Sequence, residues 1–128
     1  EMTSGPRKRR ALVIEDSCVV RKSLVRALDR LGFEVSYAVN GMEGLELLKA
    51  TMFDLVLCDF LMPVMDGMDC VKQYREWELD VHPSFRQWIV GISAHANVSD
   101  QDQGFKAGMD EFHPKPISIK TLTEIQPS

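Results

Sequence analysis

Residues that could do chemistry follow four separate predicted strands of this 128-residue chain. Carboxylates placed together repel one another unless a cation lies among them, and oxygen ligands suit Mg²⁺, which keeps waters that a phosphate can replace. A lysine and a hydroxyl beside such an ion would bind the oxygens of an anion. The pattern therefore predicts a Mg²⁺ site next to an anion site, built from Glu15, Asp16, Asp59, Ser93 and Lys115.

Asp59 is the candidate nucleophile of this group. With a metal ion, a lysine and a hydroxyl around it, its free oxygen could accept a phosphoryl group and form an aspartyl phosphate. Taken singly, the other residues have simpler explanations: helix N-terminal acids for Glu15 and Asp16, a satisfied core hydroxyl for Ser93, and a surface charge for Lys115. Their joint appearance at four strand ends favours the chemical interpretation.

Strand and helix patterns alternate five times along the chain. The stretch 55–58 is apolar without alternation, which is typical of a strand buried on both faces. The alternation predicts an α/β fold with a single five-stranded parallel sheet and helices on both faces. Right-handed crossovers bring the carboxyl ends of such strands to one rim. We expect strands at 11–14, 33–38, 55–58, 88–93 and 111–113, and helices near 20–31, 40–49, 68–79, 99–108 and 118–125.

Short sequence signals predict where some of the helices begin and which of their residues are buried. Asn40 and Ser99 each precede an acidic residue by three positions, so both are predicted N-caps. Met42 and Leu79 are expected on the buried stripes of their helices. The stretch 78–86 is polar and contains a proline, so we expect it to be a surface loop, long for an α/β unit.

Composition argues against several classes of protein. Fifteen basic and nineteen acidic residues give a net charge of −4, which argues against direct binding of nucleic acid. No apolar run has the length of a membrane span, so no membrane contact is expected. Three cysteines without CxxC spacing predict free thiols in a reducing compartment, and we expect a cytoplasmic location.

The two ends of the chain carry no periodic pattern. Residues 1–9 are expected to be a flexible lead-in, residues 10–126 the folded domain, and residues 127–128 a tail. The basic run Arg7–Arg10 is interpreted as a solvated linker, with a localisation signal or an anionic partner as alternatives.

Taken together, the motifs resemble the receiver domain of response regulators in two-component phosphorelay systems, including the receivers of hybrid histidine kinases. The resemblance covers about residues 10–126 and implies a flavodoxin-like sheet with strand order 2-1-3-4-5. Its motifs are Val13-Ile14-Glu15-Asp16, Asp59-x-x-Met62-Pro63-x-Met65-Asp66-Gly67, Ser93-Ala94 and Lys115-Pro116.

The resemblance also implies a role for each site residue. Asp59 would be the phospho-acceptor, and the backbone carbonyl of Leu61 would join the carboxylates as a Mg²⁺ ligand. Ser93 would follow the phosphoryl group, and Lys115 would be the family's cation. The bond before Pro116 would be cis. The implied metal ligands are Glu15, Asp16, Asp59 and Leu61.

A switch residue is implied three positions before the lysine, where this chain has Phe112. Tyrosine is more usual there, so the readout would rest on packing rather than on a hydroxyl. Leu61 and His95 each lie two residues after a site residue, Asp59 and Ser93. We hypothesise that they control water access and hence the lifetime of the phosphate.

The implied function is that of a signalling phospho-acceptor. It would take a phosphoryl group from a phosphohistidine on a histidine kinase or a histidine phosphotransfer domain, and then control a partner or another domain of the same chain. It would promote its own phosphorylation and dephosphorylation, and is not expected to be a conventional enzyme. The oligomeric state stays open.

Three other classes remain to be weighed. A pseudo-receiver that binds partners without phosphorylation is the main alternative. A phosphatase of the haloacid dehalogenase type is disfavoured because Leu61 occupies the position of its second aspartate. A flavin carrier is disfavoured because the loop Glu15-Asp16-Ser17 is acidic where a phosphate-binding loop should offer hydroxyls and backbone donors.

Overall fold

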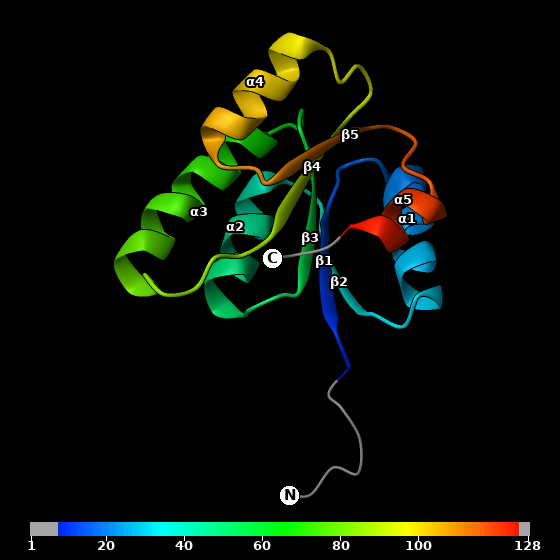
Figure 1. Cartoon of the computed structure of the whole chain (residues 1–128), viewed down its shortest axis with the longest axis horizontal. Helices are drawn as coiled ribbons and strands as arrows, with labels where there is room; N and C mark the ends of the chain where they lie inside the picture. The colour runs from blue at the N-terminus through cyan, green and yellow to red at the C-terminus, as the bar shows by residue number, and fades with distance from the viewer. Residues whose placement is uncertain (1–7, 126–128) are drawn as a thin grey trace, which may run out of the picture.

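A five-stranded parallel sheet lies between two layers of helices in the computed structural model, which describes residues 8–125 (Figure 1). The strand order is β2-β1-β3-β4-β5, which confirms the expected fold and topology. Most of the predicted lead-in and the whole tail lie outside the described residues. The strands are β1 (Arg10–Ile14), β2 (Glu34–Ala38), β3 (Leu55–Asp59), β4 (Ile89–Ser93) and β5 (Glu111–Pro114).

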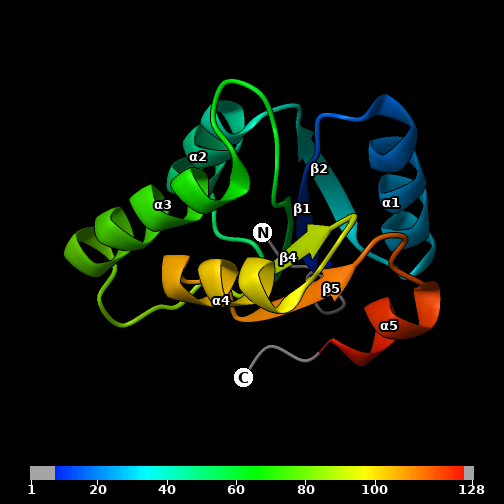
Figure 2. The same ribbon diagram turned by 90° about the horizontal axis from the view of Figure 1, so that it is seen from above.

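Helices cover both faces of the sheet, as Figures 1 and 2 show. The helices α1 (Cys18–Arg30) and α5 (Ile119–Glu124) lie on one face, and α2 (Gly41–Ala50), α3 (Gly67–Val81) and α4 (Val98–Ala107) lie on the other. Alternate side chains of a strand point to opposite faces, so β1 and β3 contribute to two separate cores. Among residues 8–125, no helix has both the length and the apolar character needed to cross a membrane.

The register of the strands brings the candidate residues to one rim. Ile14 of β1 pairs with Cys58 of β3, and Asp59 pairs with Ile92 of β4. The loop after β3 returns closely onto the strand end, because a Cβ on Gly67 would overlap the carbonyl oxygen of Asp59. Only glycine fits at such a close approach of two backbone segments.

The helix starts agree in part with the predictions. The side chain of Asn40 accepts a hydrogen bond from the Glu43 amide at 2.9 Å, which confirms it as an N-cap. The predicted cap at Ser99 is wrong, because Asn97 caps α4 two residues earlier.

The buried face of α2 differs from the prediction. Met42 was expected to be buried, but it is 44% exposed. The buried face of α2 instead runs through positions 41, 44, 45 and 48, one helical stripe that excludes position 42.

The end of α3 also differs from the prediction. The helix continues to Val81, so the start of the predicted loop is helical. Leu79 is 74% exposed, whereas Glu78 is buried. Glu78 continues the stripe of Val71 and Tyr74, but a carboxylate at that position hides the stripe from an apolar pattern search.

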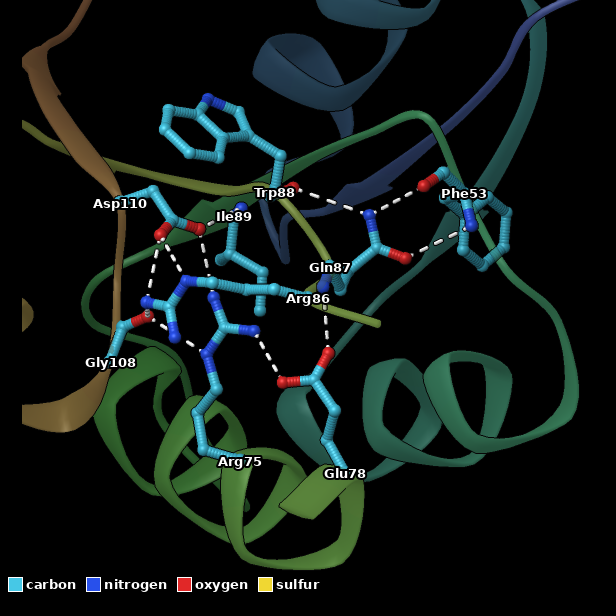
Figure 3. Close-up of polar contacts among 9 residues, drawn as sticks. All are labelled: Phe53, Arg75, Glu78, Arg86, Gln87, Trp88, Ile89, Gly108 and Asp110. Atoms are coloured by element: carbon cyan, nitrogen blue, oxygen red, sulfur yellow. Dashed lines mark hydrogen bonds and ion pairs between the residues drawn. The ribbon is translucent and has the colours of Figure 1, made fainter. Parts of the chain in front are cut away.

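A buried polar network explains the position of Glu78 (Figure 3). Its two carboxylate oxygens accept hydrogen bonds from Arg75 Nη1 at 2.8 Å and from the Gln87 amide at 2.7 Å. Arg75 also donates to the carbonyl of Gly108 at 2.9 Å and to the carboxylate of Asp110 at 2.8 Å. The network thus ties α3 to the start of β4 and to the turn between α4 and β5, at the amino-terminal ends of the strands.

Candidate functional site

Three of the predicted site residues meet at the carboxyl-terminal rim of the sheet. Glu15 is fully buried and Asp59 is 4% exposed. Lys115 Nζ lies 2.9 Å from Glu15 Oε1 and 3.1 Å from Asp59 Oδ1. The structure therefore brings two carboxylates, one directly after β1 and one at the end of β3, onto one ammonium group, as the strand-end pattern predicts.

The backbone around these side chains is held by hydrogen bonds. The amide of Glu15 donates to the Ala38 carbonyl at 3.0 Å, and the amide of Ser17 donates to Glu15 Oε2 at 3.0 Å. The amide of Lys115 donates to the Ser93 carbonyl at 2.8 Å, so the lysine is set by its pairing with β4. The Lys115–Pro116 peptide bond is cis, as expected.

Asp16 completes the group of three carboxylates, and Arg21 binds the backbone beside it. Asp16 is exposed, and one carboxylate oxygen from each of Glu15, Asp16 and Asp59 lies within 4.8 Å of the others. Arg21 Nη1 donates to the backbone carbonyls of Glu15 and Asp16 at 3.0 and 3.3 Å. The sequence motifs did not single out Arg21, although a basic residue one turn into the helix after the acidic pair is a usable signal.

The electrostatics of the rim centre on Asp59. Burial and the nearby negative charge of Glu15 raise the pKa of Asp59 from 3.8 to about 7, against the lowering effect of Lys115. Burial alone would lower the pKa of Lys115, but its contacts with Glu15 and Asp59 raise it above the ordinary value. Lys115 is therefore charged at neutral pH, whereas Asp59 changes its charge near neutral pH.

The donor set fits a hard divalent cation. All three groups are carboxylates, the ligand type that Mg²⁺ and Ca²⁺ prefer. Within residues 8–125, the buried Glu15 Oε1 has no hydrogen-bond donor besides its ion pair with Lys115. The exposed Asp16 leaves one side of the cluster open to solvent. A cation with several waters of its own would therefore fit among these three residues.

Ser93, Leu61 and His95 lie on the loops around Asp59. Ser93 is buried, and its hydroxyl accepts hydrogen bonds from the amides of His95 and Ala96 at 3.3 and 3.4 Å. The hydroxyl is thus engaged by its own loop. The side chain of Leu61 is 60% exposed and His95 is exposed. Their control of the phosphate lifetime, and the Leu61 carbonyl as a metal ligand, stay predictions.

Phe112 lies on β5 and is half-buried. Its ring and the ring of Phe60 form a T-shaped pair with a centroid distance of 5.6 Å. Phe60 directly follows Asp59, so the predicted switch residue contacts the neighbour of the predicted phospho-acceptor. Its role as a switch stays a prediction.

Comparison with known proteins decides the family. The sequence pattern of the "Response regulator receiver domain" family matches residues 11–126. The chain belongs to this family of receiver domains. The receiver is 33% identical over 118 residues to hybrid signal transduction histidine kinase K of Dictyostelium discoideum, a match that covers 88% of this chain and 10% of that protein.

Two solved structures show the same fold. The receiver superposes on the chemotaxis protein CheY4 of Vibrio cholerae with a TM-score of 0.81 and 25% identity, covering 92% of this chain and 95% of that one. The second is a response regulator of Burkholderia pseudomallei, solved with a phosphorylated aspartic acid, a calcium ion and citrate. It superposes with a TM-score of 0.77 and 26% identity, and the match covers 90% of this chain and 64% of that one. The match thus spans nearly the whole chemotaxis protein, about two thirds of the response regulator and one tenth of the hybrid kinase.

The raised pKa of Asp59 predicts a pH-dependent stability in the absence of metal. A carboxyl whose pKa is raised on folding favours the folded state below its unfolded pKa near 4, and this advantage is lost as the pH rises through about 7. In chelator at pH 8, we therefore expect Asp59→Asn to raise the free energy of unfolding by about 2–4 kcal/mol. At pH 4 the two proteins should differ little, as urea unfolding at both values will show.

Metal provides the control for this prediction. A divalent cation neutralises the carboxylates, so excess Mg²⁺ at pH 8 should stabilise the wild-type protein more than Asp59→Asn. A stability difference that stays the same from pH 4 to pH 8 would contradict the raised pKa.

Proposed function

We propose that this receiver accepts a phosphoryl group on Asp59 from a phosphohistidine of a histidine kinase or a histidine phosphotransfer domain. The pairing of a buried Asp59 with Lys115, beside the buried Glu15, supports this proposal. A carboxylate oxygen of Asp59 attacks the phosphorus, and the new P–O bond forms as the P–N bond to the histidine breaks. The electron pair of that bond stays on the histidine nitrogen, and the product is an aspartyl phosphate.

The surrounding residues orient and stabilise this transfer. Glu15, Asp16, Asp59 and the Leu61 carbonyl would hold Mg²⁺, which neutralises charge on the phosphoryl oxygens when it is bound. Lys115, whose Nζ lies 3.1 Å from Asp59 Oδ1, would exchange this ion pair for one with a phosphoryl oxygen. The Ser93 hydroxyl would then donate to another phosphoryl oxygen in place of accepting from its own loop.

The output would be a conformational change rather than catalysis of an external reaction. Movement of the Ser93 loop and of Phe112 would alter the surface formed by α4, β5 and α5. The relative in Dictyostelium is a hybrid kinase that contains the matching segment, so the partner could be another domain of the same chain.

The cysteines bear on the location of the protein. Cys18, Cys58 and Cys70 are free thiols, which suits the reducing cytoplasm.

A mass measurement tests the proposal. Intact protein is incubated with acetyl phosphate, with Mg²⁺ or with chelator, and its mass is recorded for the wild type and Asp59→Asn. We expect a phosphoryl adduct only for the wild type with Mg²⁺, because the variant lacks the nucleophilic oxygen.

The matched control is Asp80→Asn, which removes an exposed carboxylate near the C-terminal end of α3. It should form the adduct as the wild type does. A folded wild-type protein that binds Mg²⁺ but forms no adduct would overturn the proposal and favour a pseudo-receiver.

A further inference from the structure

A cavity of about 210 Å³ lies at the end of the sheet opposite the candidate site, where the strands begin. Aromatic side chains line it: Phe33 precedes β2, Phe53 precedes β3, and Phe85 and Trp88 precede β4. An apolar cavity of about 150 Å³ is large enough to hold benzene. This cavity therefore has room for one aromatic ring with a small substituent.

Hydrogen bonds fix the walls of the cavity. The buried side-chain amide of Gln87 accepts from the Phe53 N–H at 3.0 Å and donates to the Phe53 carbonyl at 2.6 Å (Figure 3). The indole Nε1 of Trp88 donates to Glu111 Oε2 at 2.8 Å, which holds that ring in place. The cavity is thus preformed, as sites for small molecules usually are.

Arg9 places a positive charge at this cavity. Its guanidinium lies over the Phe33 ring, with Cζ 4.6 Å from the ring centroid. Stacking uses the flat face of a guanidinium and leaves its N–H groups for a planar anion. The Arg9 carbonyl accepts from the Glu34 amide at 2.8 Å, so the backbone of Arg9 is held against the sheet.

Arg86 also lines the cavity and is held by its neighbour. Its Nε and Nη2 atoms each lie 2.8 Å from Asp110 Oδ1, so among residues 8–125 its Nη1 stays available to a ligand. Among the described lining residues, Asp54 alone is acidic, and its Oδ2 accepts from the Arg10 amide at 2.7 Å. The lining thus carries one more positive than negative charge, which favours an anion.

We propose that this cavity binds a small aromatic carboxylate, whose ring lies among the aromatic walls and whose carboxylate binds Arg9 and Arg86. Flat aromatic walls pack best against a flat ring, and the planar fork of arginine matches the two oxygens of a carboxylate. The two guanidinium groups disfavour a cationic guest. The site lies at the opposite end of the strands from Asp59, so this proposal does not depend on the proposed function.

Titration with benzoate, followed in N–H NMR spectra, tests the site. We expect the indole signal of Trp88 and the amide signals of Phe33 and Phe53 to shift and saturate, with a Kd of about 1 mM or tighter. Trp77 on α3 does not line the cavity, so its indole signal serves as an internal reference and should stay in place. A Trp88 signal that stays in place, or that moves without saturation, would overturn the proposal.

Two related ligands separate the ring from the charge. Benzyl alcohol keeps the ring but has no charge, and cyclohexanecarboxylate keeps the charge but has no flat ring. Each should bind at least about tenfold more weakly than benzoate, because each loses one of the two matched features. Equal affinity for benzyl alcohol would overturn the role of the arginines, and equal affinity for cyclohexanecarboxylate would overturn the preference for an aromatic ring.

Substitutions outside the two core clusters test the residues themselves. Arg9 is exposed and Phe85 is half-buried in the loop before β4, so both variants should fold. Arg9→Gln should weaken benzoate binding by about tenfold and leave benzyl alcohol unaffected, whereas Phe85→Ala should weaken both ligands. Arg26→Gln, at an exposed arginine of α1, is the matched control and should bind as the wild type does. Wild-type affinity for benzoate in either Arg9→Gln or Phe85→Ala would overturn the site.

Discussion

Replacing Lys115 with alanine is expected to slow phosphorylation of the receiver by about 100–1,000-fold, the usual effect of removing one charge-stabilising group from a transition state. Lys115 is the cation that contacts both Asp59 and Glu15, so its loss leaves two buried carboxylates facing each other. The incoming phosphoryl oxygens would then meet uncompensated negative charge. The rate is measured from the growth of the phosphoryl adduct with acetyl phosphate and Mg²⁺.

Lys115→Arg is the matched variant for this prediction. It keeps the positive charge but replaces a compact ammonium group by a planar guanidinium, so part of the rate should return. Mg²⁺ binding should persist in Lys115→Ala, because the carboxylates are retained. A rate within tenfold of the wild type for Lys115→Ala would show that the lysine does not stabilise the transfer.

Replacing Arg75 with alanine is expected to lower the free energy of unfolding by about 3–5 kcal/mol, the usual cost of breaking a buried ion pair by removing one partner. The side chain of Arg75 is 11% exposed, and those of its partners Glu78 and Asp110 are each 6% exposed. Its removal leaves two buried carboxylates that lose their shared donor. Urea unfolding at pH 7 measures the loss.

Arg86 provides a control at the same acceptor. It also binds Asp110 at 2.8 Å, but its side chain is 56% exposed (Figure 3). Solvent competes for an exposed ion pair, so Arg86→Ala should cost only about 0–1 kcal/mol. Equal losses for the two variants would mean that burial does not set the strength of this network.

Much of the site could be predicted from the sequence. Asp59 ends an apolar run of the kind found in central strands, and parallel topology brings such strand ends together whatever the details of packing. The same reasoning places Glu15 and Lys115 at the rim, where the structure has them in contact. The periodicity of the sequence was sufficient to predict these positions, because all strands of a parallel sheet run in the same direction and end at the same rim.

Other features follow from partners that are far apart in the chain. Glu78 looks like the start of a loop in the sequence, and only its bonds to Arg75 and Gln87 explain why it is buried and why α3 continues past it. Asp110 reaches Arg75 across 35 positions. Pattern searches count apolar residues, so a buried carboxylate with a distant partner reads as surface.

The packing of Phe112 against α4 shows the same division. The family resemblance singles out Phe112 as a switch residue, but no sequence pattern connects it with Gly104. The two meet because the turn after α4 folds β5 back against that helix, and the absence of a Cβ has meaning only when a neighbour occupies the space. The sequence by itself thus determined the sheet and the residues at its rim, through periodicity and parallel topology. Only the tertiary structure decided the Arg75 network and the packing of Phe112 against α4, because both depend on side chains packed between separate elements.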